Sequence, residues 1–418
     1  LQATDSAQKF VMTNKNARFG LANSNGEIKG KFKNEGFKIL LPDTKSEISD
    51  DLIVANIDNK NINVENSTIK VNKNSNISFV GDVKNYLTDS ETKFTADGLL
   101  SAKDIENFLG EAVAPYFDSK GNIPVKARFQ AHGQKMKVVS QLQTNVNDYI
   151  TPVKFSELEG KPVLFQLMAE KNGNIAKVYR SGVFLRKKGA DFRDKLHQNM
   201  IGAKEIVGLR AVLINLDTNP FISLFKLNLP RNLNGSICLF PKSKFVLGGN
   251  VYAYGNLNNP KINGNFDIRD LSIPEIYTTV RNITTDINGQ GLKVAISDVN
   301  ANESDFTVKV QSSWKQISQM KLADVKVNSK SIDVDKILKV SDSLMASLPK
   351  TGATSGANST PAIIPVEILD GNINLKNIKT GNILVNNTTG KISLYKNVFY
   401  VNKLKTSPLG GKVTGDVA

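Results

Sequence analysis

An alternation of apolar and polar residues over Lys261–Ile268 constrains the fold of this chain more than any other feature. Ile262, Phe266 and Ile268 fall on one side of an extended strand, and polar residues fall on the other. A period of two residues is typical of a β-strand with one buried and one solvated face. Gly264 falls on the apolar side, where its missing side chain predicts a bulge, a bend or the close approach of another group.

The same alternation recurs along most of the chain, between turns rich in Asn, Gly, Asp and Lys. It predicts a mainly β fold. The residues alone leave two architectures open, because the apolar strand faces must be covered by something. One is a closed sandwich, and the other is an open, twisted sheet whose apolar face is occupied by lipid. Examples of the alternating pairs are Ile62/Val64, Ile69/Val71, Phe306/Val308/Val310, Val325/Val327 and Ile392/Leu394.

Three segments depart from this pattern and carry apolar residues at helical spacing. We expect short amphipathic helices over Ala102–Phe117, Asp191–Ile206 and Val334–Leu348.

Two of these segments belong to an internal repeat. Asp104–Leu109 aligns without a gap on Asp333–Leu338, and upstream Ile77–Gly81 resembles Phe306–Val310. An Asp before an apolar helix is common on its own, since its carboxylate accepts the free N–H groups there. Because the preceding strands match as well, we interpret the alignment as a structural repeat, which is typical of an elongated architecture with contacts between neighbouring units.

The predicted organisation has five parts. Residues 349–362 are rich in Gly, Ala, Ser and Thr and indicate a flexible linker. The others are a β-repeat unit ending in a short helix at 1–110, a middle β-rich segment at 111–245 with a helix near 191–206, a β-repeat unit ending in a helix at 246–348, and C-terminal strands at 363–418.

The formal net charge of +15 is carried mostly by lysines that are spread singly along the strands. Nucleic-acid-binding proteins usually cluster Arg and Lys with aromatic residues, whereas Arg186–Lys188 is the only tight basic run. We therefore expect solvated strand faces first, attraction to anionic lipid headgroups second, and no nucleic-acid partner. Cys238 is the only cysteine, so no disulfide can form within the chain.

The sequence contains no constellation that indicates catalysis. His132 and His197 lie in different segments, without the spacing of metal ligands around either. We therefore expect a non-enzymatic protein without a catalytic residue, metal or cofactor. A carbohydrate-active β-protein would need paired carboxylates and aromatic subsites, and Trp314 is the single tryptophan. A surface-exposed structural or adhesin-like β-sandwich is a further alternative; Leu348–Gly352 matches a cell-wall sorting pentapeptide, but more than sixty residues of strand-like sequence follow it.

Several stretches of the second half carry a specific resemblance. They are Gly255–Pro274, Pro365–Leu375, Thr389–Leu394 and Leu409–Val417. The first resembles the G-x-L-x-x-P-x-I-x-G element of the AsmA/TamB-like envelope proteins of diderm bacteria, and the others resemble the AsmA-like C-terminal region. The resemblance covers roughly residues 245–418, extends to 1–110, and is weakest over 111–244.

This resemblance implies an elongated, repeating antiparallel β-sheet curled into an open apolar groove. It further implies a periplasmic protein, anchored in the inner membrane through an N-terminal segment that this chain lacks. Such a protein would act as a lipid-transfer bridge or an outer-membrane biogenesis factor, with phospholipids, both membranes and outer-membrane assembly proteins as partners. The residues expected to line the lipid groove are Ile262, Phe266, Ile268, Phe306, Val308, Val310, Ile373, Leu375, Ile392 and Leu394.

Overall fold

The computed structural model describes residues 2–5, 10–41, 46–72, 74–104, 121–145, 153–187, 192, 195–347, 366–396 and 398–418. Within these ranges 27 strands belong to one open sheet, which confirms the mainly β prediction. The chain divides into two compact units. Unit 1 comprises Leu1–Thr151, Glu157–Leu227 and Tyr254–Asn259, and unit 2 comprises Pro152–Ser156, Asn228–Ala253 and Pro260–Ala418.

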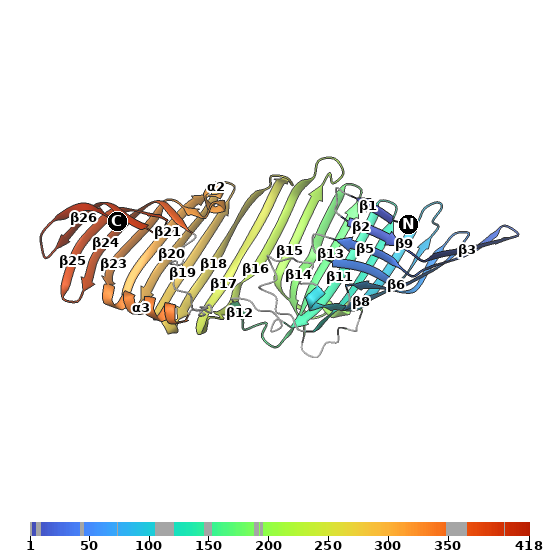
Figure 1. Ribbon diagram of the computed structural model, residues 1–418, viewed down its shortest axis with the longest axis horizontal. Helices are drawn as coiled ribbons and strands as arrows, with labels where there is room; N and C mark the ends of the chain where they lie inside the picture. Colours follow the sequence, from blue (N-terminus) through green and yellow to red (C-terminus); the bar gives the residue numbers. More distant parts are fainter. Residues whose placement is uncertain are drawn as a thin grey trace, which may run out of the picture. The chain divides into compact units, whose positions relative to one another are not determined.

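Unit 1 is built from strands that pair in antiparallel fashion, and from β7 to β15 the pairs follow the chain as a meander (Figure 1). Within the described part of unit 1, one 3-10 turn, η4 (Gln198–Met200), lies before β15. Its strands are β1 (Gln2–Asp5), β2 (Phe10–Asn14), β3 (Ala17–Ser24), β4 (Glu27–Asn34), β5 (Phe37–Leu41), β6 (Ser46–Asp58), β7 (Ile62–Val71), β8 (Ser75–Lys84), β9 (Glu91–Ser101), β10 (Asn122–His132), β11 (Lys135–Asn145), β13 (Pro162–Asn172), β14 (Ile175–Leu185) and β15 (Lys204–Ile214).

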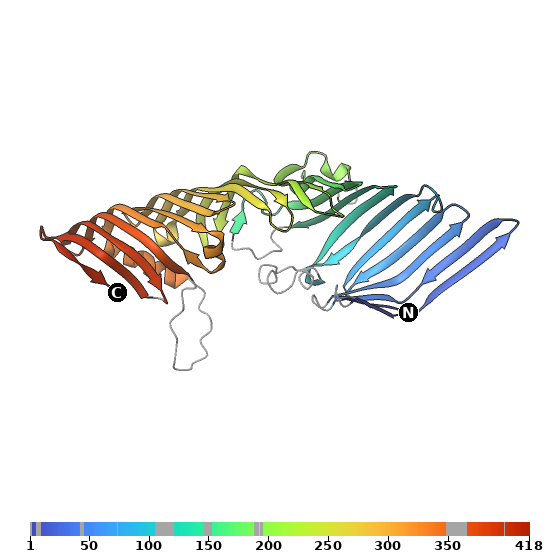
Figure 2. The same cartoon turned by 90° about the horizontal axis from the view of Figure 1, so that it is seen from above.

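Apart from the short strand β12, unit 2 is a second run of strands, drawn from yellow to red in Figure 2. β16 (Phe221–Ile237) and β17 (Phe240–Asn256) contribute residues to both units. The remaining elements are β12 (Val153–Phe155), β18 (Lys261–Ile273), η5 (Pro274–Ile276), β19 (Thr278–Asn288), β20 (Gly291–Ala301), β21 (Ser304–Ser313), α2 (Trp314–Ser318), β22 (Lys321–Leu322), β23 (Val325–Asp333), α3 (Val334–Ser347), β24 (Glu367–Thr380), β25 (Ile383–Tyr395), β26 (Val398–Pro408) and β27 (Val413–Val417).

One connection in unit 2 joins strands that pair in parallel. β24 pairs in parallel with β22 and β23, whereas the other pairs of this unit with a defined register are antiparallel. Parallel neighbours need a crossover connection, which commonly contains a helix. The chain supplies this crossover through α3, where Val340 packs against a small apolar cluster of Phe240, Ile273 and Ile276.

The strands form a single open sheet rather than the closed sandwich that the sequence left open. The accessible surface is 25909 Å² for a chain of 45.7 kDa. A compact monomer of this mass exposes only about 16,000 Å². This excess of accessible surface is expected for a sheet that has no second sheet stacked on it. In such a sheet few hydrophobic side chains are fully buried.

Small polar side chains are among the most buried groups, and they mark places where strands bulge. Ser181 is 1 % exposed and lies beside a register shift in β14; its hydroxyl oxygen accepts a hydrogen bond of 2.7 Å from the Met168 N–H. The Ser67 hydroxyl oxygen likewise accepts a hydrogen bond of 3.0 Å from the Val54 N–H, and Ser67 lies beside a register shift in β7. A bulge leaves backbone groups of the ladder unpaired and bends the strand, so a short hydroxyl side chain is a suitable replacement partner.

The predicted helices have three different outcomes. The segment Val334–Leu348 is confirmed as α3, whereas Asp191–Ile206 is not a helix. The described part of that segment contains one 3-10 turn, and β15 begins at Lys204. Its spaced apolar residues pack onto the sheet instead. Ala102–Asp104 is helical, but residues 105–120 and the predicted linker at 349–362 lie outside the described residues.

Gly264 fits the predicted close approach. A Cβ atom at this position would lie 2.4 Å from the carbonyl oxygen of Asn250 and 2.8 Å from the Cα of Val251. The neighbouring strand β17 therefore approaches to a distance that a side chain would prevent.

Candidate functional site

The strand registers of unit 2 place apolar residues in rows that cross the sheet. Residues paired across neighbouring strands share one face, so a row can be followed from strand to strand. The clearest row crosses seven strands and consists of aliphatic residues until it ends at a glycine. It runs through Ile268, Ile283, Ile296, Val308, Val327, Ile373 and Gly390.

All ten residues that the sequence predicts for the groove lie on the face that carries this row. They come from four strands, β18, β21, β24 and β25, and the registers bring them to one side of the sheet. Nine of them are half-buried, and Ile392 is 4 % exposed. We call this side of unit 2 the apolar face; whether it contacts lipid stays a prediction.

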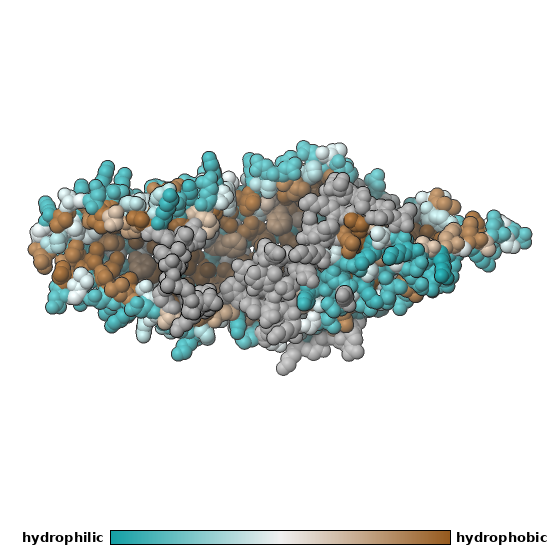
Figure 3. All heavy atoms as spheres, in the orientation of Figure 1, coloured by the Kyte–Doolittle hydropathy of each residue, from teal (hydrophilic) through white to brown (hydrophobic). Residues whose placement is uncertain are grey.

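The opposite side of the same strands is polar. One residue along from the aliphatic row, a second row carries mainly lysine, asparagine and other hydrophilic residues. It runs through Asp267, Thr284, Ala295, Lys309, Lys326, Asn372 and Lys391. Figure 3 shows the consequence for the C-terminal half of the visible side, where apolar residues occupy the middle and hydrophilic residues the margins.

A bulge in β20 keeps the apolar residues of this strand on one face. In β20 the register shifts between Ile296 and Val299, and Asp298 takes a left-handed backbone with φ 50°. The shift returns Val299 to the apolar face opposite Phe306, although an unbroken strand would place it on the polar face. A bulge also increases the local twist of the strand that carries it.

Unit 1 has the same two-faced construction, although for residues 111–244 the sequence predicted only a β-rich segment and left the strand register open. The signal was present in the alternation within each strand, but it is diluted by Ala, Gly and Thr on the apolar side. Two apolar rows each cross eight strands. The first runs through Ile69, Ile77, Gly98, Val125, Leu142, Phe165, Val183 and Val207, and the second through Val64, Gly81, Phe94, Phe129, Val138, Ala169, Val178 and Ala211.

Charged residues on the polar face of unit 1 pair across strands. Lys137 contacts Glu170 at 3.2 Å, and Tyr179 donates a hydrogen bond to the same carboxylate. The Tyr179 hydroxyl and then Lys137 hold the pKa of Glu170 below its usual value, and the hydrogen bond to Glu170 raises the pKa of Lys137. Both shifts widen the pH range over which the Lys137–Glu170 pair is ionised.

The two histidines have different neighbours within the described residues. His132 is the last residue of β10, and its Nε2 atom lies 2.9 Å from a carboxylate oxygen of Asp89. His197 lies beside η4 and lines a cavity on the polar face of unit 1. No group of three or more metal-ligating side chains occurs in the described ranges. Of the helices described, none has the length and apolar character needed to cross a membrane.

Comparisons with family models, with curated proteins and with solved structures gave no match to this chain. The resemblance to AsmA/TamB-like proteins therefore stays a prediction.

Proposed function

We propose that the apolar face shields phospholipid acyl chains, and that the protein is a non-enzymatic lipid-transfer bridge or outer-membrane biogenesis factor acting between the inner and outer membranes. The observation that carries this proposal is the aliphatic row from Ile268 to Ile373, which crosses adjacent strands and ends at Gly390, while its residues stay half-exposed. A row of this length and exposure is unusual for a soluble sheet, because water makes such a surface costly.

The dimensions suit an acyl chain. Neighbouring strands are about 4.8 Å apart, so a row across seven strands extends for about 29 Å. The hydrocarbon core of a whole bilayer is about 30 Å thick, and one acyl chain fills half of it. Each methylene group that leaves water contributes about 0.8 kcal/mol. One row can therefore offset much of the free energy of removing a chain from a membrane.

The bulges support a concave form of the apolar face. Asp270 and Asp298 both take positive φ values within strands of unit 2, at 51° and 50°. Repeated bulges are the usual means by which a sheet is curved. We propose that they curl the apolar face into the groove that the sequence predicts, with the lysine-rich face outside. The excess positive charge would then attract anionic headgroups near the groove.

The test is native mass spectrometry, with extraction of bound lipid, on protein purified from a diderm host. Wild-type protein is expected to carry phospholipid, and Val308→Asp is expected to lose it while staying folded. Gln311→Asp is the matched control, because Gln311 lies on the same strand but on the exposed, polar face opposite Lys293. A folded, lipid-free wild-type protein would contradict the proposal and would favour the alternative, a surface-exposed structural or adhesin-like role.

A further inference from the structure

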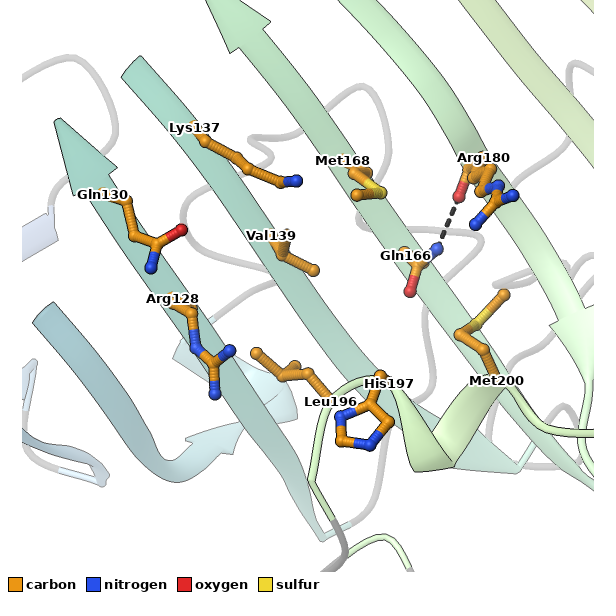
Figure 4. Close-up of a pocket in the computed structure, with 10 residues that line it drawn as sticks. All are labelled: Arg128, Gln130, Lys137, Val139, Gln166, Met168, Arg180, Leu196, His197 and Met200. Atoms are coloured by element: carbon orange, nitrogen blue, oxygen red, sulfur yellow. Dashed lines mark hydrogen bonds between the residues drawn. The ribbon is translucent and has the colours of Figure 1, made fainter. Parts of the chain in front are cut away.

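A cavity of about 300 Å³ lies on the polar face of unit 1 (Figure 4). Strands β10, β11, β13 and β14 form its floor, and the segment around η4 covers it through Leu196, His197 and Met200. The floor residues Gln130 and Lys137 are paired and alternate with the apolar pair Phe129 and Val138. The cavity is therefore on the side of the sheet opposite the apolar rows, and it plays no part in the proposed lipid groove.

Three of the ten described residues that line this cavity are cationic. They are Arg128, Lys137 and Arg180, and none of the described lining residues is a carboxylate. Lys137 is partly neutralised by its contact with Glu170. Within the described ranges, neither Arg128 nor Arg180 forms an ion pair. Two guanidinium groups at one small cavity, neither paired with a described carboxylate, attract an anion.

The backbone places Arg180 at the cavity by a bulge. The register of β14 shifts across Arg180 against both neighbouring strands, β13 and β15. Arg180 has φ 46°, a left-handed conformation that long side chains rarely adopt. The bulge is held by neighbouring groups, since the Gln166 side chain donates a hydrogen bond to the Arg180 carbonyl and Ser181 bonds to Met168. Bulges of this kind redirect side chains and are common beside binding sites.

The covering segment is held in place by buried amides. Asn199 is 1 % exposed and donates to the Gln141 side-chain oxygen at 2.8 Å. Gln141 in turn donates to the Leu196 carbonyl at 2.8 Å and to the Gln166 oxygen at 2.6 Å. Leu164, Phe184 and Phe192 form an apolar cluster with Met200 packed against it. The cavity is thus preorganised by contacts between residues that are distant in the sequence, which lowers the cost of binding.

We propose that this cavity binds the phosphate group of a small organic phosphate. Guanidinium groups match the planar arrangement of phosphate oxygens and bind them through paired hydrogen bonds. Val139, Met168 and Leu196 add apolar surface that suits a short carbon skeleton attached to the phosphate. The volume limits the ligand to a small ester or to the headgroup of a phospholipid presented from outside.

The first arm of the test measures binding of inorganic phosphate and glycerol 3-phosphate by isothermal titration calorimetry at low ionic strength. The second arm measures co-sedimentation with phosphatidylglycerol vesicles against phosphatidylcholine vesicles. Arg128→Gln and Arg180→Asn are each expected to weaken binding about tenfold or more, because each removes a charge-assisted contact. Asn is chosen at position 180 because it tolerates positive φ.

Lys177→Gln is the matched control, since Lys177 lies on β14 and pairs with Glu170 but does not line the cavity. It removes one positive charge from the same face and is expected to change binding less than twofold. Binding in the first arm identifies a free phosphate ester, and binding to phosphatidylglycerol vesicles alone identifies a lipid headgroup. Absence of binding in both arms would overturn the proposal, as would binding that all three variants weaken equally. Neither result depends on whether Val308→Asp loses lipid.

Discussion

Units 1 and 2 share a two-faced sheet but differ in what accompanies it. Both present apolar rows on one face and charged residues on the other. In unit 1 a segment around η4 covers part of the polar face and encloses a cavity, whereas in unit 2 the helix α3 carries the chain across to a parallel strand. A sheet with one apolar side is therefore common to both units. The segment around η4 is specific to unit 1, and the helix α3 is specific to unit 2.

A pair of buried serines strengthens this comparison. The offset of 229 residues that aligns Asp104 with Asp333 also aligns Ser75 with Ser304. Ser75 is 1 % exposed and Ser304 is fully buried at 0 %. Ser75 accepts a hydrogen bond from the Ser101 N–H, three residues before Asp104, and Ser304 accepts one from the N–H of Asp333 itself. Both units thus place a buried serine against the segment that carries the aligned Asp, although the bonded residues are not the aligned ones.

The largest expected effect comes from placing a charge on the apolar face of each unit. Phe79 is the residue of unit 1 that the same offset aligns with Val308. Phe79→Asp and Val308→Asp are both expected to abolish most of the co-purifying phospholipid, because a carboxylate next to an acyl chain must be desolvated. The measurement is lipid content per protein by mass spectrometry. If only one variant loses lipid, the two units differ in function despite their shared construction.

The next effect separates the segment around η4 from the helix α3. Phe192 is 7 % exposed and joins the covering segment to Leu164 and Phe184. Phe192→Ala is expected to cost about 3 kcal/mol, since a buried aromatic side chain is removed. Hydrogen exchange should then increase around η4 and leave α3 unchanged. Val340→Ala, which trims the cluster under α3, should give the opposite pattern at a cost of about 1–2 kcal/mol. If either variant increased hydrogen exchange equally around η4 and in α3, these two elements would not be independent of each other.

The serine pair predicts a smaller effect that tests the repeat. Ser304→Ala leaves the Asp333 N–H without its partner and is expected to cost about 1–3 kcal/mol. Ser75→Ala should cost at least as much, because Ser75 also donates to the buried Asp104 carboxylate at 2.7 Å. Chemical denaturation of both variants provides the measurement. A negligible change in either would mean that the aligned serine has no equivalent structural role.

The smallest effect concerns pH. The pKa of Glu170 is lowered from 4.5, first by the Tyr179 hydroxyl and then by Lys137. Because the folded pKa is below the unfolded one, the ionised carboxylate adds stability above about pH 4.5. That contribution is lost as the pH falls through the lower, folded value. Glu170→Gln should therefore reduce the acid sensitivity of unfolding between pH 5 and pH 3 by a small amount, since the pair is partly exposed. An unchanged pH profile would argue against the Glu170 contacts.

The strand faces could be predicted from the sequence because alternation is local information. All ten residues chosen for the groove lie on one face, and α3 ends within one residue of its predicted end. The short helix α2 was missed, although the spacing of Ser313 and Gln316 is a capping box that could have indicated it.

Other features depend on contacts that no local pattern encodes. Phe192, Leu196 and Met200 have helical spacing, but Phe192 and Met200 pack on strands, so the predicted helix was wrong. The cavity on the polar face depends on Gln141 meeting Asn199, which is 58 residues away. Buried serines at bulges look like solvated strand residues in the sequence. Their role follows from the register, which only the folded sheet defines.

The most direct test of the central claim places a photo-crosslinking residue on each face of one strand. Val308→p-benzoylphenylalanine and Gln311→p-benzoylphenylalanine would be expressed in a diderm host and irradiated in intact cells. We expect phospholipid adducts at position 308 and none at position 311, because only the first lies on the apolar face. Adducts at neither position, or at both equally, would contradict the claim that this face shields acyl chains.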